Sequence, residues 1–90
     1  MIETFKLIIT GQVQGVGFRP HVYKLALKFG LKGTVSNNEY GVIIYAQAPK
    51  EVVYQFYKTL IENPPVASKI SSHSIDEVGC KHFNDFKIVD

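Results

Sequence analysis

A glycine-rich segment at residues 11–20 constrains the fold of this chain more than any other feature of its ninety residues. It reads Gly-Gln-Val-Gln-Gly-Val-Gly-Phe-Arg-Pro and contains three glycines. Before it, the stretch Thr4–Thr10 places an apolar residue at every second position from Phe5 to Ile9, which is typical of a half-buried strand. After it, Pro20 suits the first turn of a helix, where its missing N–H costs nothing. The segment is therefore predicted to be a loop that leads from a strand into a helix.

The rest of the chain predicts further strands and a second helix around one sheet. The first helix has an apolar stripe at helical spacing and a glycine at its end, namely Val22, Leu25, Ala26, Phe29 and then Gly30. Strands are predicted at Gly33–Asn37, at Val42–Ala48, near Lys69–Asp76 and near Phe83–Val89. The second helix begins at Pro49 and Lys50 and ends at Asn63-Pro64-Pro65. This order is β-α-β-β-α-β plus a short final strand, the α+β arrangement of the ferredoxin-like split βαβ sandwich. We expect a mostly antiparallel sheet with two helices on one face.

Size and composition indicate a single globular domain over residues 1–90. Hydrophobic residues make up 46% of the chain and charged residues 20%, as is usual for globular proteins. The longest apolar run, Val42–Ala46, is far shorter than the roughly 20 residues of a membrane span. Met1–Thr10 carries charges inside an alternating pattern and does not resemble a secretory signal. One cysteine, Cys80, excludes an internal disulfide, so a cytoplasmic location without a membrane partner is expected.

Charge and histidine placement argue against nucleic-acid and metal partners. The net charge is only +2, from ten basic and eight acidic residues, which is too small and dispersed for a nucleic-acid stripe. The three histidines lie far apart and include no i, i+4 pair, so they do not form a metal-binding pattern: His21, His73 and His82. We expect no metal and no other cofactor.

Arg19 is the only arginine among the ten basic residues. In a chain that otherwise uses lysine, a lone arginine suggests a planar fork that binds an oxyanion through two parallel hydrogen bonds. Glycines within Gly11–Gly17 let backbone N–H groups turn inward as an anion nest, and the helix start adds partial positive charge. Because the residue before a proline avoids the α region, Arg19 is expected to be extended before Pro20, like a cap. The alternative is a glycine-rich turn with a surface arginine.

Asn37 lies at the end of a predicted strand, where the turn Asn37–Gly41 begins. Asparagine at such a place commonly makes an Asx turn, so from this residue alone a turn role is favoured over a catalytic one.

Two motifs resemble those of the acylphosphatase family over essentially the whole chain. The loop resembles the family signature as Gly11-x-Val13-Gln14-Gly15-Val16-x-Phe18-Arg19. The second motif is similar at Gly33-x-Val35-x-Asn37, followed by Gly41-Val42. A narrower resemblance, to the N-terminal acylphosphatase-like domain of the HypF carbamoyltransferases of hydrogenase maturation, rests on Gly17-Phe18-Arg19-Pro20-x-Val22-Tyr23-x-Leu25-Ala26 and on Pro64-Pro65-x-Ala67.

The resemblance implies a role for each residue of the loop and for Asn37. The backbone of Gln14, Gly15, Val16, Gly17, Phe18 and Arg19 would cradle the phosphoryl oxygens. Arg19 would neutralise their charge, and Asn37 would orient the attacking water, which reverses the preference for a turn role. This chain departs from the family at Thr34, where tryptophan is common, and in the turn before Gly41, which lacks the common aspartate. Both departures put the shape of the site in question more than its chemistry.

The function implied by the resemblance is metal-free hydrolysis of small acyl phosphates, with carbamoyl phosphate as a candidate substrate and inorganic phosphate as a product. This substrate class suits the residues because a carboxylate leaves without needing a positioned general acid. The HypF resemblance implies further domains of a larger protein as partners. One alternative is a non-catalytic anion-binding or docking module that needs other domains for activity. Another is an RNA-binding module with the same element order, but Tyr40–Gln47 lacks the aromatic and basic pattern of such modules.

Overall fold

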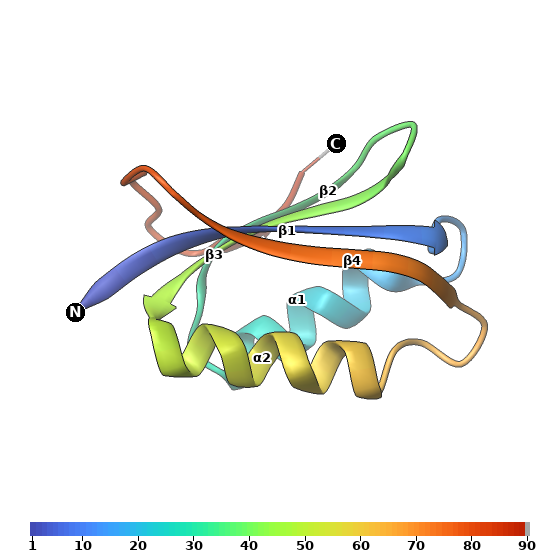
Figure 1. The fold of residues 1–90 in the computed structure, drawn as a ribbon, viewed down its shortest axis with the longest axis horizontal. Coiled ribbons are helices and arrows are strands. Elements are labelled where there is room, and N and C mark those ends of the chain that lie inside the picture. Colours follow the sequence, from blue (N-terminus) through green and yellow to red (C-terminus); the bar gives the residue numbers. More distant parts are fainter. Residues whose placement is uncertain (90) are drawn as a thin grey trace.

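The structure of the protein is a computed structural model that describes residues 1–89, and it contains five strands and two helices (Figure 1). They are β1 (Ile2–Gln12), α1 (Phe18–Lys28), β2 (Lys32–Asn37), β3 (Gly41–Pro49), α2 (Lys50–Glu62), β4 (Lys69–Val78) and β5 (Phe86–Ile88). The strands form one sheet in the order β4-β1-β3-β2-β5, antiparallel except between β2 and β5. Both helices lie on the same face of this sheet (Figure 1). The predicted ferredoxin-like α+β fold is confirmed.

Several element boundaries differ from the prediction, and strand pairing explains two of the differences. β1 continues to Gln12 instead of ending at Thr10, since β4 pairs with it beyond Thr10, where the pairing with β3 stops. The last strand covers Phe86–Ile88 instead of Phe83–Val89, because only Gly33–Val35 of β2 pairs with it. Pairing with a neighbour, which no local pattern reports, sets both of these ends.

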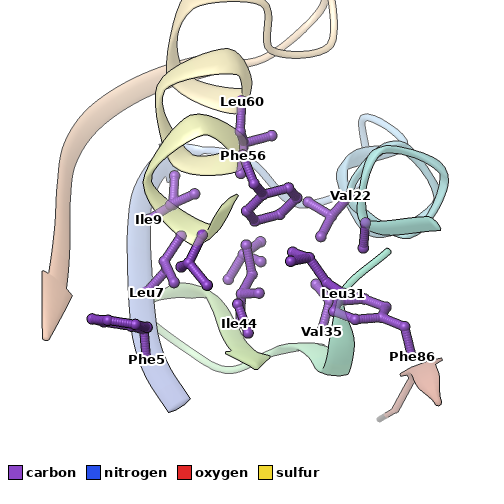
Figure 2. Close-up of a cluster of buried hydrophobic side chains, with 14 of the residues drawn as sticks. Phe5, Leu7, Ile9, Val22, Leu31, Val35, Ile44, Phe56, Leu60 and Phe86 are labelled. Carbon is purple, nitrogen blue, oxygen red and sulfur yellow. The ribbon is translucent and has the colours of Figure 1, made fainter. Parts of the chain in front are cut away.

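The core lies between the sheet and the two helices (Figure 2). The alternation predicted for β1 is confirmed, because Phe5, Leu7 and Ile9 are at most 1% exposed. Phe56 and Leu60 of α2 pack over them and are fully buried. Each such side chain contributes about 1.5–3 kcal/mol when it leaves water.

Gly33 is required in β2 because the backbone of β3 lies against it. Its φ is 145°, and a Cβ at this position would lie 1.7 Å from the carbonyl oxygen of Tyr45. We therefore expect Gly33→Ala to lower the free energy of unfolding by about 3 kcal/mol or more in urea denaturation. Gly79→Ala is the matched control, because no atom lies within 4 Å of a Cβ built there. Equal stability of the two variants would contradict this close approach of the strands.

Candidate anion-binding site

Two glycines of the loop between β1 and α1 have left-handed backbone. Gly15 and Gly17 have φ values of 72° and 76°, whereas Val16 between them has a negative φ. Segments in which left-handed residues alternate with right-handed ones direct successive N–H groups to the same side, which forms a concave nest for an anion. The angles of Gly15 and Gly17 are compatible with the predicted nest.

Gly15 and Gly17 are needed for their backbone angles and not for lack of space. Nothing lies within 4 Å of a Cβ built on either glycine, and both residues are exposed. Left-handed backbone costs an L-residue about 1–2 kcal/mol, so alanine at either position would strain the loop without a steric clash. The open surroundings leave the loop accessible to a small anion from solution.

The helix that follows starts directly at the loop. Gly17 caps α1 in the left-handed region, and the N–H of His21 donates to its carbonyl at 3.2 Å. The next residue, Phe18, is 2% exposed and anchors the helix start in the core. The first turn has no acidic residue, so the positive end of the helix dipole is not neutralised by a carboxylate of that turn.

The predicted backbone of Arg19 is wrong. Arg19 is the second residue of α1 and not an extended cap before Pro20, because the helix begins at Phe18. The bias of a pre-proline residue against the α region is only a preference. Here Gly17 already reverses the chain at the cap position, and Pro20 still occupies the first turn, where its missing N–H costs nothing. Arg19 is half-buried at the positive end of the helix.

The turn between β2 and β3 is built by Asn38 and not by Asn37. The Oδ1 atom of Asn38 accepts hydrogen bonds from the N–H groups of Tyr40 at 2.8 Å and of Gly41 at 2.9 Å. Its own N–H donates to the carbonyl of Gly41 at 2.9 Å. These are the bonds of an Asx turn. The turn role considered for Asn37 is therefore filled by its neighbour.

Asn37 has a buried side-chain oxygen without a hydrogen-bond donor among the described residues. It is the last residue of β2 and pairs with Val42 of β3. Its Oδ1 atom is buried and accepts no hydrogen bond from residues 1–89. A buried polar atom without a partner costs about 1–3 kcal/mol, and such atoms are uncommon in folded proteins. This acceptor has unused hydrogen-bonding capacity, which a water can use once a small movement of the side chain or the turn exposes the oxygen.

The loop and the turn are joined by the side chain of Gln14. Its Nε2 atom donates to the carbonyl of Asn38 and, at 3.2 Å, to the carbonyl of Gly41. Both segments also line one recess of about 450 Å³. Its walls are Gly11, Gln12, Val13, Gln14, Val16, Glu39, Tyr40, Gly41 and Ala67. Of the predicted site residues, Gln14 and Val16 line this recess, whereas Arg19 and Asn37 do not.

Two polar contacts of the site were missed in the sequence analysis, namely the Gln14 side chain and the Asn38 turn. The sequence Asn37-Asn38-Glu39-Tyr40-Gly41 is compatible with an Asx turn starting at either asparagine, so the choice required the structure. No pattern in the sequence pairs Gln14 with a turn 24 residues away.

The hydrogen-bonded pair of Tyr57 and His73 lies outside this site. Burial and the neighbouring Tyr54 raise the pKa of Tyr57, whose hydroxyl hydrogen-bonds His73 on β4. No cluster of three or more potential metal ligands occurs within residues 1–89. Neither helix in the described part of the chain has the length and apolar character that a membrane crossing requires.

The sequence is similar to two groups of known proteins. The family model for acylphosphatase matches residues 5–88. An acylphosphatase of Pseudothermotoga lettingae is 44% identical over 82 residues, which are 90% of this chain and 91% of that protein. A probable carbamoyltransferase HypF of Methanocaldococcus jannaschii is 40% identical over 85 residues, which are 93% of this chain but 11% of that protein.

Similar solved structures belong to the same two groups, HypF proteins and acylphosphatases. The crystal structure of full-length HypF in its phosphate- and nucleotide-bound form superposes with a TM-score of 0.97 at 41% identity, and it covers all of this chain. This chain spans only 12% of that protein. The acylphosphatase of Bacillus subtilis superposes with a TM-score of 0.90 at 33% identity, with 100% of both chains covered.

Proposed function

The chain belongs to the acylphosphatase family, whose members hydrolyse acyl phosphates, and we propose that it does so at the loop Gln14–Arg19 with the help of Asn37. The observation that supports this proposal is that the Gln14 side chain ties the loop, with its left-handed Gly15 and Gly17, to the turn that directly follows Asn37. The Oδ1 atom of Asn37 is buried and accepts no hydrogen bond from the described residues, so a water reaches it only after a small movement of the side chain or the turn. A phosphoryl group on the loop and a water on Asn37 would then be held by linked segments.

The proposed reaction uses positioning and electrostatics alone. N–H groups of the loop and the guanidinium of Arg19 hold the phosphoryl oxygens and stabilise the charge that spreads over them. Asn37 Oδ1 accepts a hydrogen bond from a water, which leaves a lone pair of that water free to attack phosphorus in line. The bond from phosphorus to the water oxygen forms as the bond to the acyl oxygen breaks. In balance, RCO–OPO₃²⁻ and H₂O give RCO₂⁻ and H₂PO₄⁻.

This set of groups favours acyl phosphates over phosphate monoesters. A carboxylate is a weak base and leaves without a proton, so no general acid is required. An alkoxide leaving group would need one. The groups proposed to hold the phosphoryl oxygens are backbone amides and a guanidinium, and neither gives up a proton near neutral pH.

Carbamoyl phosphate is the substrate we propose for this chain if it works as part of a HypF-like protein. The support is the similarity to HypF proteins, of which it matches 11–12% of the length. In that setting, inorganic phosphate is the second product and the remaining domains of the larger protein are its partners. The same similarity supports an alternative, namely an anion-binding domain that needs those other domains for activity. This alternative predicts phosphate binding without turnover in the isolated chain.

Hydrolysis in H₂¹⁸O tests the proposed direction of attack. Water that attacks phosphorus places the label in inorganic phosphate, whereas attack on the carbonyl carbon places it in the carboxylate. We expect enzyme-catalysed turnover of benzoyl phosphate to place ¹⁸O in phosphate, as read by mass spectrometry, with buffer alone as the control. Label found mainly in benzoate would contradict the proposed role of Asn37.

A further inference from the structure

The side chain of Gln14 ties the phosphate loop to the turn that follows Asn37. Gln14 is an exposed residue, and its loop backbone is already part of the proposed nest. Its Nε2 atom nevertheless donates both of its hydrogens within the protein, to the carbonyls of Asn38 and Gly41. A primary amide has two N–H donors, so neither remains for a bound phosphate.

The two carbonyls that Gln14 contacts mark the two ends of the turn. Asn38 follows Asn37 directly, and Gly41 is the first residue of β3. The turn is closed by the Asx bonds of Asn38 and by the bond from the Asn38 N–H to the Gly41 carbonyl. A contact with both ends fixes the position of the whole turn relative to the loop.

Asn37 directly precedes this turn. Its buried Oδ1 atom accepts no hydrogen bond from the described residues, so its position follows from packing and from the backbone of the strand end and the turn. Displacement of a positioning group by about 1 Å can cost a hundredfold in rate. The alignment of an attacking water therefore depends on what holds the turn.

We infer that Gln14 is a positioning residue, which holds the β2–β3 turn against the phosphate loop so that Asn37 Oδ1 meets the water in line with the bound phosphoryl group. This inference rests on the proposed function, because it assigns Gln14 an effect on turnover through Asn37. It separates two uses of one residue: the backbone of Gln14 contributes to the anion loop, and its side chain aligns the water.

Gln14→Leu removes both donors at similar size, and Gln55→Leu is the matched control, because Gln55 is an exposed glutamine on α2 outside the site. For benzoyl phosphate we expect Gln14→Leu to lower kcat at least about tenfold and to change the Ki of inorganic phosphate less than about threefold. Gln55→Leu is expected to retain both values. A kcat within twofold of wild type, or equal losses in kcat and phosphate affinity, would overturn the inference.

A double-mutant cycle with Asn37→Ala asks whether Gln14 acts through Asn37. If it does, Gln14→Leu has no further effect on kcat once Asn37 is alanine, because the group that it positions is gone. If the two losses in kcat multiply in the double variant, Gln14 acts independently of Asn37, and the inference is wrong. Normal turnover in Asn37→Ala alone would overturn the proposed role of Asn37 itself, which distinguishes the two failures.

The pH dependence of kcat in Gln14→Glu is a further test, because a general loss of rigidity in the fold would not change it. Above the pKa of the introduced carboxyl group, its charge faces two carbonyl oxygens and pushes the turn away. The same repulsion disfavours the ionised form and raises that pKa above the usual carboxyl range. We expect the kcat of this variant, relative to wild type at the same pH, to rise at least threefold between pH 7 and pH 4.5, as the carboxyl group gains a proton that it can donate. A constant ratio over this range would contradict the contact with the turn.

Discussion

Replacing Arg19 with alanine is expected to weaken the binding of inorganic phosphate at least about a hundredfold. A guanidinium can give two charge-assisted hydrogen bonds to one phosphate, and removal of a donor that stabilises an oxyanion commonly costs two to three orders of magnitude. Arg19 is half-buried in the first turn of α1 and lies outside the apolar core. The free energy of unfolding should therefore change by only about 1 kcal/mol. Isothermal titration calorimetry and urea denaturation check the two expectations separately.

Two further variants separate charge from geometry in this result. Arg19→Lys keeps the positive charge but loses the planar fork, so it should recover only part of the lost affinity. Lys28→Ala removes a positive charge from the last turn of the same helix and should leave phosphate binding unchanged within about twofold. Full recovery in the lysine variant would show that the fork is unnecessary. Unchanged binding in Arg19→Ala would remove Arg19 from the site.

Replacing Asn37 with alanine is expected to reduce kcat about a hundredfold or more while phosphate affinity changes less than about threefold. The reason is that Asn37 is proposed to act on the water and not on the phosphoryl group. Its Oδ1 atom is buried and accepts no hydrogen bond from residues 1–89, so alanine also removes a desolvation cost of about 1–3 kcal/mol. We therefore expect the variant to be at least as stable as wild type in urea denaturation.

Ser36→Ala is the control for this variant, because Ser36 is the neighbouring residue on β2 and belongs to neither proposed group. It should keep its turnover within about twofold. Equal losses of turnover and of phosphate affinity in Asn37→Ala would mean that Asn37 contacts the phosphate. A loss of stability of several kcal/mol would mean that its side chain supports the fold instead.

The fold could be predicted from sequence because each element has a local cause. Alternation at Phe5, Leu7 and Ile9 sets the buried face of β1, and these residues are buried as expected. The glycines of residues 11–17 also predict the loop. In the structure Gly15 and Gly17 have the left-handed backbone that favours glycine. Strand ends were less accurate, because pairing with a distant strand determines where a strand stops.

The site residues were harder to assign because their roles depend on contacts between distant segments. The local rule for proline predicted an extended Arg19, but the left-handed Gly17 allows the helix to start earlier. The local rule for asparagine favoured the turn role for Asn37, but Tyr40 and Gly41 donate to Asn38 instead. Asn38 therefore makes the turn, and the Asn37 oxygen accepts no hydrogen bond from the described residues.

The most direct test follows the hydrolysis of benzoyl phosphate and of carbamoyl phosphate with a metal chelator present. It compares wild type with an Arg19→Ala variant whose folding is verified by circular dichroism. We predict turnover well above buffer for wild type, unaffected by the chelator, and loss of that turnover in the variant. Turnover that survives in folded Arg19→Ala would place the chemistry elsewhere on the protein. Wild type no faster than buffer with both substrates would contradict catalysis by this chain and favour an anion-binding domain that needs the rest of a larger enzyme.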